Sequence, residues 1–164
     1  MSGQAMKVRR RILGQEHNDT LNSMLMVGLA YKLRARWDAA EELEVQVMET
    51  RKKTLGVDHL DALTSMANLA SMYRNRGRWD AAEELEVQVM EARKKKLGID
   101  HPDTLASMNN LAFTWMGASR ETEAVKLMEE YIQLQKRVLG LDHPFTLSSC
   151  AALAAWKAKQ GDVL

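Results

Sequence analysis

The sequence predicts an all-α protein, built as a right-handed superhelical solenoid of antiparallel helix pairs. Its four histidines lie 42 residues apart, and Leu-Gly pairs recur in the same register. A fixed period of this length indicates a repeat architecture, in which stacked units complete each other's core. Good helix formers dominate the composition, and Val and Ile never alternate over a run as they do in strands. The histidines are His17, His59, His101 and His143.

Each period contains two amphipathic segments. In the second period, Leu63, Met66 and Leu69 fall on one helical face, Gly77 interrupts, and Trp79 opens a second apolar stripe. The window 37–56 matches 79–98 at 18 of 20 positions. We therefore expect a partial helix at 4–13, first helices at 18–34, 60–76, 102–117 and 144–160, and second helices at 37–55, 79–97 and 121–139. These make about three full pairs, a partial helix at the start and an unpaired helix at the end.

The junctions carry helix-ending and helix-starting signals. Gly98 follows a Lys-rich last turn, which is typical of a helix C-terminus. The Asp of each junction is predicted to be the N-cap of the next helix, and the two prolines fit its first turn. These residues are Asp58, Asp100, Asp142, Pro102 and Pro144.

We expect one repeat domain over residues 1–164, with repeats at about 17–58, 59–100 and 101–142 and a terminal half-repeat at 143–164. Residues 4–13 align with the end of a second helix, so the chain is predicted to begin inside a repeat, as a piece of a longer array or the carboxyl end of a larger protein. In two repeats a non-glycine residue, Ala35 or Ser119, occupies the position of the turn glycine Gly77.

The second repeat carries the pattern Asn68-Leu69-Ala70-x-x-Tyr73-x-x-x-Gly77-x-Trp79-x-x-Ala82. This pattern resembles the tetratricopeptide signature. The 42-residue period and the junction Leu-Gly-x-Asp-His-Pro-Asp-Thr-Leu at 97–105 look like the kinesin light chain type of repeat. The nearly identical copies are also similar to the repeat arrays of fungal NACHT-type immune receptors. The resemblance implies a protein-binding fold in which small residues let paired helices cross closely.

The resemblance also implies that the first helix of each pair lines a concave groove. Asn68 and Asn110 match the asparagine that contacts the ligand backbone in peptide-binding relatives, and a carboxamide has both the donor and the acceptor for this. An asparagine that only bonds to a neighbouring helix is the open alternative. The candidate groove residues are Leu29, Lys32, Asn68, Ser71, Arg74, Asn75, Asn109, Asn110, Phe113 and Met116.

The leading functional prediction is a non-enzymatic scaffold that binds a peptide or protein segment in this groove. The alternative is a self-association, assembly or sensor segment of a larger receptor-type protein, acting through exposed terminal helices. A formal net charge of +1 argues against a nucleic-acid partner, and the absence of an apolar run of about 18 residues argues against a membrane span. The lone Cys150 favours a reducing, cytoplasmic setting.

No cofactor, metal site or catalytic residue is predicted. The sequence has no phosphate loop or nucleophile motif, and its glutamates are expected on solvated helix faces. Histidines in equivalent positions of stacked repeats should lie roughly 10 Å apart, since that is the distance between packed helices. Zinc ligands must lie at about 2 Å from the metal, so the histidines are assigned to junction packing or capping.

Overall fold

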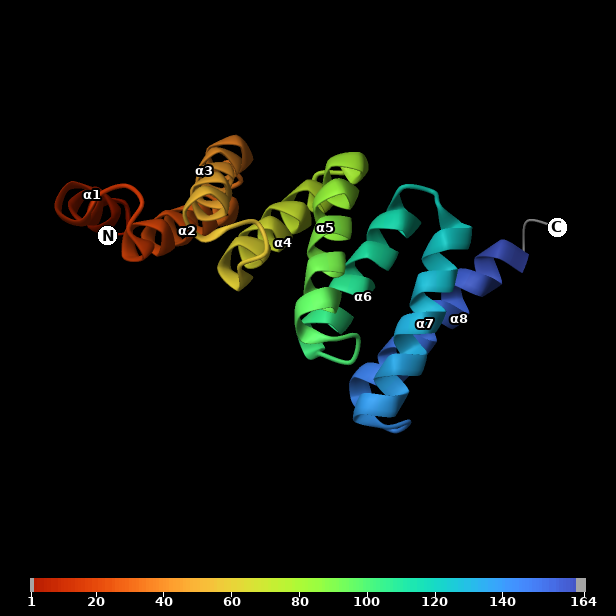
Figure 1. Ribbon diagram of the computed structural model, residues 1–164. Helices are drawn as coiled ribbons and strands as arrows, with labels where there is room; N and C mark the ends of the chain where they lie inside the picture. Colours follow the sequence, from red (N-terminus) through yellow and green to blue (C-terminus); the bar gives the residue numbers. More distant parts are fainter. Residues whose placement is uncertain (1, 162–164) are drawn as a thin grey trace. The chain divides into compact units, whose positions relative to one another are not determined.

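The computed structural model describes residues 2–161, which form eight α-helices and no strand (Figure 1). Residue 1 and residues 162–164, the end of the predicted terminal half-repeat, lie outside the described residues. The helices are α1 (Ser2–Leu13), α2 (Asn18–Leu33), α3 (Trp37–Leu55), α4 (Leu60–Asn75), α5 (Trp79–Leu97), α6 (Pro102–Gly117), α7 (Glu121–Leu139) and α8 (Pro144–Gly161).

The predicted helices are confirmed. The second helices α3, α5 and α7 and the first helix α6 have the predicted bounds, and the other four helices differ by one or two residues at an end. The second helices end cleanly because each is followed by a glycine with a positive φ, such as Gly98 at 93°. That backbone conformation is strained for other residues, so the glycine sets the boundary.

The helices group into two compact units, one up to Met72 and one from Tyr73 onward, so the last residues of α4 belong to the second unit. In the amino-terminal unit, α2 packs against both α1 and α3. Its core holds Leu21, Met24 and Val47, and Met6 of α1 and Leu43 of α3 pack around them. Each helix buries one stripe, as the 3.6-residue periodicity requires.

In the carboxyl-terminal unit, α6 packs against α5 and α7, and α7 also packs against α8. One continuous core runs through α6, α7 and α8. It contains Leu105, Met108, Leu111, Ala112, Ala124, Leu127, Met128, Tyr131, Ile132 and Trp156. The small residues Ala112 and Ala124 are fully buried, consistent with the close helix crossing that the sequence predicted.

The histidines, and not the junction aspartates, cap the first helices. His17 Nδ1 accepts the Asp19 N–H at 3.2 Å, and His101 Nδ1 accepts the Asp103 N–H at 3.1 Å. His59 and His143 accept equivalent bonds from the backbone two residues on. The predicted N-caps Asp58, Asp100 and Asp142 were therefore wrong: each helix begins directly after its histidine, so the aspartate lies one residue too early to cap.

The turn between the two helices of a pair requires a left-handed residue. Gly77 has φ of 71°, whereas Ala35 and Ser119 adopt φ of 55° and 61° at the same repeat position. The two substitutions noted in the sequence therefore keep the turn and place a strained backbone in it.

Candidate interaction surfaces

In the amino-terminal unit, the predicted groove residues lie on α2 and α4. Leu29 and Asn68 are exposed, and Ser71 is half-buried. Lys32 turns toward α3, where its Nζ lies 2.5 Å from Glu44 Oε1. This lysine is therefore engaged within its own helix pair.

In the carboxyl-terminal unit, Arg74 is engaged in the same way. Its Nη1 lies 3.4 Å from Glu86 Oε1 and donates to the Asn110 carbonyl oxygen at 3.1 Å. The side chain of Asn110 is half-buried, and Asn75 at the end of α4 is exposed. Both cations predicted for the groove thus bind partners inside the repeats, which leaves uncharged groups to define the surface.

The remaining predicted residues, Asn109, Phe113 and Met116, lie on α6. Met116 packs against the core, whereas Phe113 is 42% exposed. Asn109 and Phe113 line a hollow of about 290 Å³ between α6 and α8. Its other lining residues are Tyr131, Phe145, Ser148, Ser149 and Ala152. We call this hollow the α6–α8 hollow; none of its lining residues is charged.

The walls of the α6–α8 hollow are held in place by neighbouring side chains. The rings of Phe113 and Trp156 meet in a T-shaped arrangement, with centroids 5.0 Å apart and planes at 78°. This edge-to-face geometry is favourable for aromatic pairs. Buried Gln135 donates to the Tyr131 hydroxyl at 2.8 Å. The hollow is thus a preformed site of mixed aromatic and polar character.

Two glutamates that were expected on solvated faces are buried. Glu44 and Glu86 are each 4% exposed and pair with Lys32 and Arg74. Burial raises the pKa of Glu86, and the nearby Glu83 adds to this, while Thr114 and Arg74 act in the opposite direction. The sequence could have indicated that Arg74 and Glu86 are paired, because the residues 42 positions later are Met116 and Met128, so both members change together.

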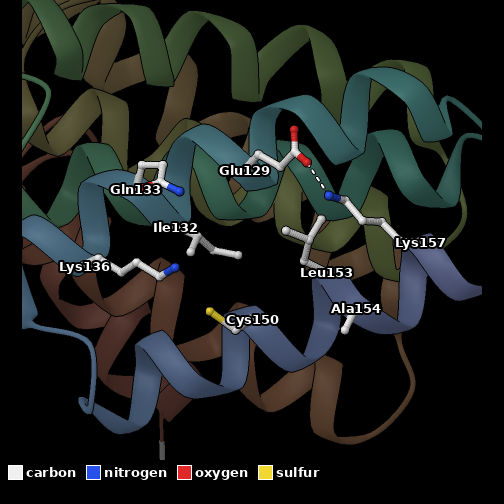
Figure 2. A pocket seen from close by; sticks show the side chains of 8 residues that line it. All are labelled: Glu129, Ile132, Gln133, Lys136, Cys150, Leu153, Ala154 and Lys157. Atoms are coloured by element: carbon white, nitrogen blue, oxygen red, sulfur yellow. Dashed lines mark ion pairs between the residues drawn. The ribbon is translucent and has the colours of Figure 1, made fainter.

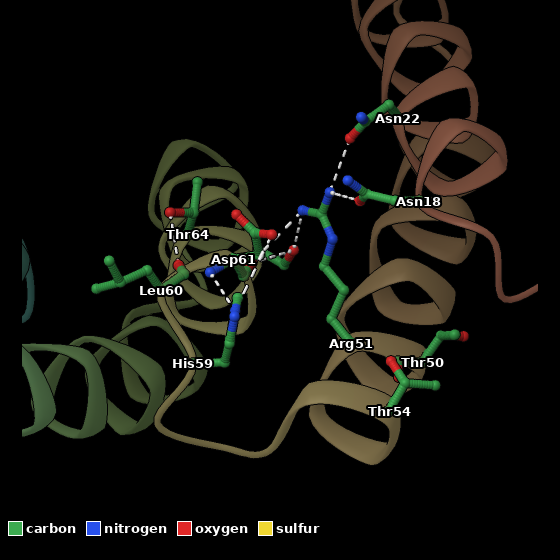
Figure 3. Close-up of polar contacts among 10 residues, drawn as sticks. Asn18, Asn22, Thr50, Arg51, Thr54, His59, Leu60, Asp61 and Thr64 are labelled. Carbon is green, nitrogen blue, oxygen red and sulfur yellow. Dashed lines mark hydrogen bonds and ion pairs between the residues drawn. The ribbon is translucent and has the colours of Figure 1, made fainter.

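A buried arginine that the sequence analysis missed joins three helices of the amino-terminal unit (Figure 3). Arg51 of α3 donates to the hydroxyl of Ser65 on α4 at 2.9 Å. It also donates to the side-chain oxygens of Asn22 at 2.8 Å and Asn18 at 3.3 Å on α2. Arg51 is 5% exposed. Because these partners are neutral protein groups, the cluster acts as a structural cross-link between the helices.

The arginine–serine part of this cluster repeats along the chain. Arg9 bonds to Ser23 at 2.5 Å, and Arg93 bonds to Ser107 at 3.0 Å, both 14 residues apart like Arg51 and Ser65. The 42-residue spacing of these arginines in the sequence could have indicated that the bond recurs. In these three places the bond links a second helix to the first helix that follows it.

A second hollow, of about 490 Å³, lies between α7 and α8 (Figure 2). We call it the α7–α8 hollow. Its centre is apolar, with Ile132, Cys150, Leu153 and Ala154, and its rim is polar. On the rim, Lys157 Nζ lies 2.5 Å from Glu129 Oε1. Gln133 and Lys136 complete the lining.

Within the described residues, no group of three or more His, Cys, Asp and Glu side chains is placed to hold a metal ion. Over the same residues, no helix is both long and apolar enough to span a membrane.

Comparison with known proteins identifies the fold. The sequence model of the tetratricopeptide repeat family matches residues 20–61, 62–103 and 104–145. The chain is also similar to two solved structures of a Podosopora anserina protein with nearly identical TPR-like repeats, assigned as a kinesin light chain; one of the two is a variant. Both are 32% identical to this chain, cover 98% of it and are matched over 76% of their own length, with TM-scores of 0.87 and 0.86.

A third similar structure, BtubC (BKLC) from P. vanneervenii, has a TM-score of 0.78 at 16% identity, covering 96% of this chain and 64% of its own, and so supports the fold alone. No curated protein sequence matches significantly. The resemblance to NACHT-type receptors stays a prediction. Tetratricopeptide repeats generally serve as non-catalytic scaffolds for protein interaction. With three matched repeats and eight helices over residues 2–161, the chain belongs to the tetratricopeptide repeat family.

Proposed function

We propose that this chain is an interaction scaffold that binds a peptide or protein segment on the face of its first helices, with the α6–α8 hollow as an anchor site. The observation that supports this most is the uncharged hollow between two first helices, walled by Phe113, Tyr131 and Phe145. Aromatic walls beside a few polar groups are typical of sites that anchor a side chain and a peptide backbone.

The composition of the hollow favours one class of ligand. Asn109 and Ser148 offer hydrogen-bonding groups beside the rings, and no lysine or arginine is available to bind a free carboxylate. We therefore expect an internal peptide segment with an apolar side chain in the hollow. Asn68 and Asn110 remain proposed backbone contacts, with Asn68 the more accessible of the two.

Peptide-library panning tests this proposal. The wild-type chain is compared with Ser148→Arg, which places a long cation in the α6–α8 hollow from an exposed position. The matched control is Ala151→Arg, which is exposed on the same helix and lines neither hollow. A consensus enriched by the wild type and Ala151→Arg, but not by Ser148→Arg, supports the proposal; the same consensus from all three proteins contradicts it.

The alternative function, self-association through terminal helices, rests on a different observation. On α1, Ile12 is 73% exposed and Val8 is 50% exposed. The same helix carries Arg9, Arg10 and Arg11, which repel a second copy. Sedimentation equilibrium over about a hundredfold concentration range distinguishes self-association from a monomeric scaffold. An average mass that rises with concentration, and that returns to the monomer mass in Ile12→Asp, would favour self-association. A constant monomer mass would exclude self-association for this chain.

A further inference from the structure

The α6–α8 hollow opens on a face that stays open where a first helix is packed on both sides. On α8, Phe145 and Ser148 are exposed and line the hollow. The residues 42 positions earlier, Asp103 and Ala106 of α6, are exposed as well, although α6 packs against both α5 and α7 and has α8 across the hollow. The opening therefore belongs to the first-helix face itself.

Three aromatic rings wall the hollow at positions where the preceding repeat has no aromatic residue: Phe113, Tyr131 and Phe145 take the places of Ser71, Val89 and Asp103. The two exposed rings are held by neighbours. Phe113 meets Trp156, and the ring centre of His143 lies 5.3 Å from that of Phe145. Because these walls are fixed before a ligand arrives, a stiff ligand can bind to them with little loss of conformational freedom.

The hydrogen-bonding groups beside the rings favour a carbonyl oxygen of the ligand. Tyr131 is 8% exposed, and its hydroxyl accepts a hydrogen bond from Gln135, so the hydroxyl hydrogen remains available for donation. Asn109 and Ser148 add further donors. A peptide group without an N–H suits this setting, because a buried N–H would need an acceptor of its own. The carbonyl group that precedes a proline belongs to such a peptide group.

The other common modes of peptide recognition fit this site less well. An amphipathic helix needs apolar anchors along several turns, whereas the hollow is a single site of about 290 Å³. A free carboxylate or a phosphorylated residue needs cations, and the lining has none. An added strand needs the edge of a sheet, and residues 2–161 form no strand. Proline-rich segments, by contrast, dock in grooves lined by aromatic side chains.

We infer, on the basis of the proposed function, that the α6–α8 hollow binds a proline in an extended, polyproline-type segment of a partner protein. The proline ring packs between Phe113 and Phe145, and the carbonyl oxygen that precedes it accepts a hydrogen bond from Tyr131. Such a segment is largely extended before it binds, so little chain entropy is lost on binding.

Two phage-displayed pools of short peptides test this inference. The central residue is proline in one pool and leucine in the other, and the flanking positions are random but without proline. The whole chain is expected to enrich the proline pool at least about tenfold more strongly than the leucine pool. Ser148→Arg should abolish this enrichment, and the matched control Ala151→Arg, which lines neither hollow, should preserve it.

The best peptide of the proline pool then tests the hydrogen bond. With a fluorescein label, its affinity for the whole chain is measured by fluorescence anisotropy. Tyr131→Phe should weaken binding by about three- to tenfold, as expected for the loss of one hydrogen bond. Gln135→Met keeps the tyrosine hydroxyl and removes its neighbour, so this control should change the affinity by less than about twofold.

The results separate the inference from the proposed function. If the leucine pool is enriched as strongly as the proline pool and Ser148→Arg abolishes both enrichments, the hollow is an anchor site for a different side chain and the inference is overturned. Unchanged binding of the proline peptide by Tyr131→Phe also overturns it. Enrichment that survives Ser148→Arg, or no enrichment of either pool, contradicts the proposed function and the inference together.

Discussion

Three successive helix pairs place different chemistry at the same two facing positions. The first pair has Lys32 and Glu44, and the second has Arg74 and Glu86, each joined as an ion pair. The third has Met116 and Met128, which belong to one apolar core. Both members change together, which indicates that each position depends on its partner: either a buried charge with its counter-charge, or two apolar side chains.

The largest expected effect on stability comes from removing only the cation of one buried ion pair. Arg74→Met leaves Glu86 buried without its cation and should lower the free energy of unfolding by about 2–4 kcal/mol. The double variant Arg74→Met/Glu86→Met copies the third pair and should lie within about 1 kcal/mol of the wild type. Urea unfolding of both variants checks this; equal losses in the single and double variants would show that the pair is not coupled.

The second comparison concerns two helical glycines. A Cβ at Gly117 would lie 2.5 Å from the Trp79 ring, whereas a Cβ at Gly28 would find its nearest neighbour at 3.8 Å. Gly117→Ala should therefore lose about 1–3 kcal/mol through displacement of the ring. Gly28→Ala should gain about 0.5–1 kcal/mol, because alanine is the better helix former. Thermal unfolding of the two variants should give shifts of opposite sign, and shifts of the same sign would contradict the packing described here.

Substitutions at the turn between paired helices should have a smaller effect on stability. Ala35→Gly and Ser119→Gly should each raise the free energy of unfolding by about 0.5–1 kcal/mol, since they relieve positive φ angles of 55° and 61°. Gly77→Ala, at φ of 71°, is the reverse control and should cost a similar amount. Chemical unfolding of the three variants measures this, and a loss on introducing either glycine would rule out strain at that turn.

The smallest effect is a pH dependence. Burial raises the pKa of Glu86 in the folded state, so the folded chain holds a proton there that the unfolded chain has already released. This group therefore contributes stability at low pH that is lost as the pH rises through its folded-state pKa. Relative to Glu86→Gln, which does not titrate, the wild type should lose stability as the pH rises from the ordinary glutamate pKa through the raised folded-state pKa of Glu86. A difference that is constant across this range would contradict the raised pKa.

The fold could be predicted from the sequence because the 42-residue period and the apolar stripes are features of short stretches of the chain. The bounds of α3, α5 and α7 follow from a tryptophan or glutamate start and a glycine stop that are visible in every repeat. The N-caps were mispredicted because an Asp and a His precede each of α4, α6 and α8, and only the backbone geometry decides which side chain reaches the free N–H groups.

The candidate site was predicted less completely. The family resemblance implied that Asn109 and Phe113 lie on the groove-lining helix, but the contribution of Phe145, Ser148 and Ala152 from α8 depends on how two helices pack. The burial of Glu44 and Glu86 was missed for the same reason, because a glutamate on a helix looks solvated until its partner cation on the neighbouring helix is known.

The most direct test of the proposed function is one anisotropy titration of the consensus peptide from panning against three proteins: wild type, Ser148→Arg and Ala154→Arg. If the peptide binds on the face of the first helices, Ser148→Arg, in the α6–α8 hollow, should weaken binding by about tenfold or more. Ala154→Arg, in the α7–α8 hollow, should leave binding unchanged. Binding that survives Ser148→Arg and is lost in Ala154→Arg would contradict the account and place peptide recognition on the other face of α8.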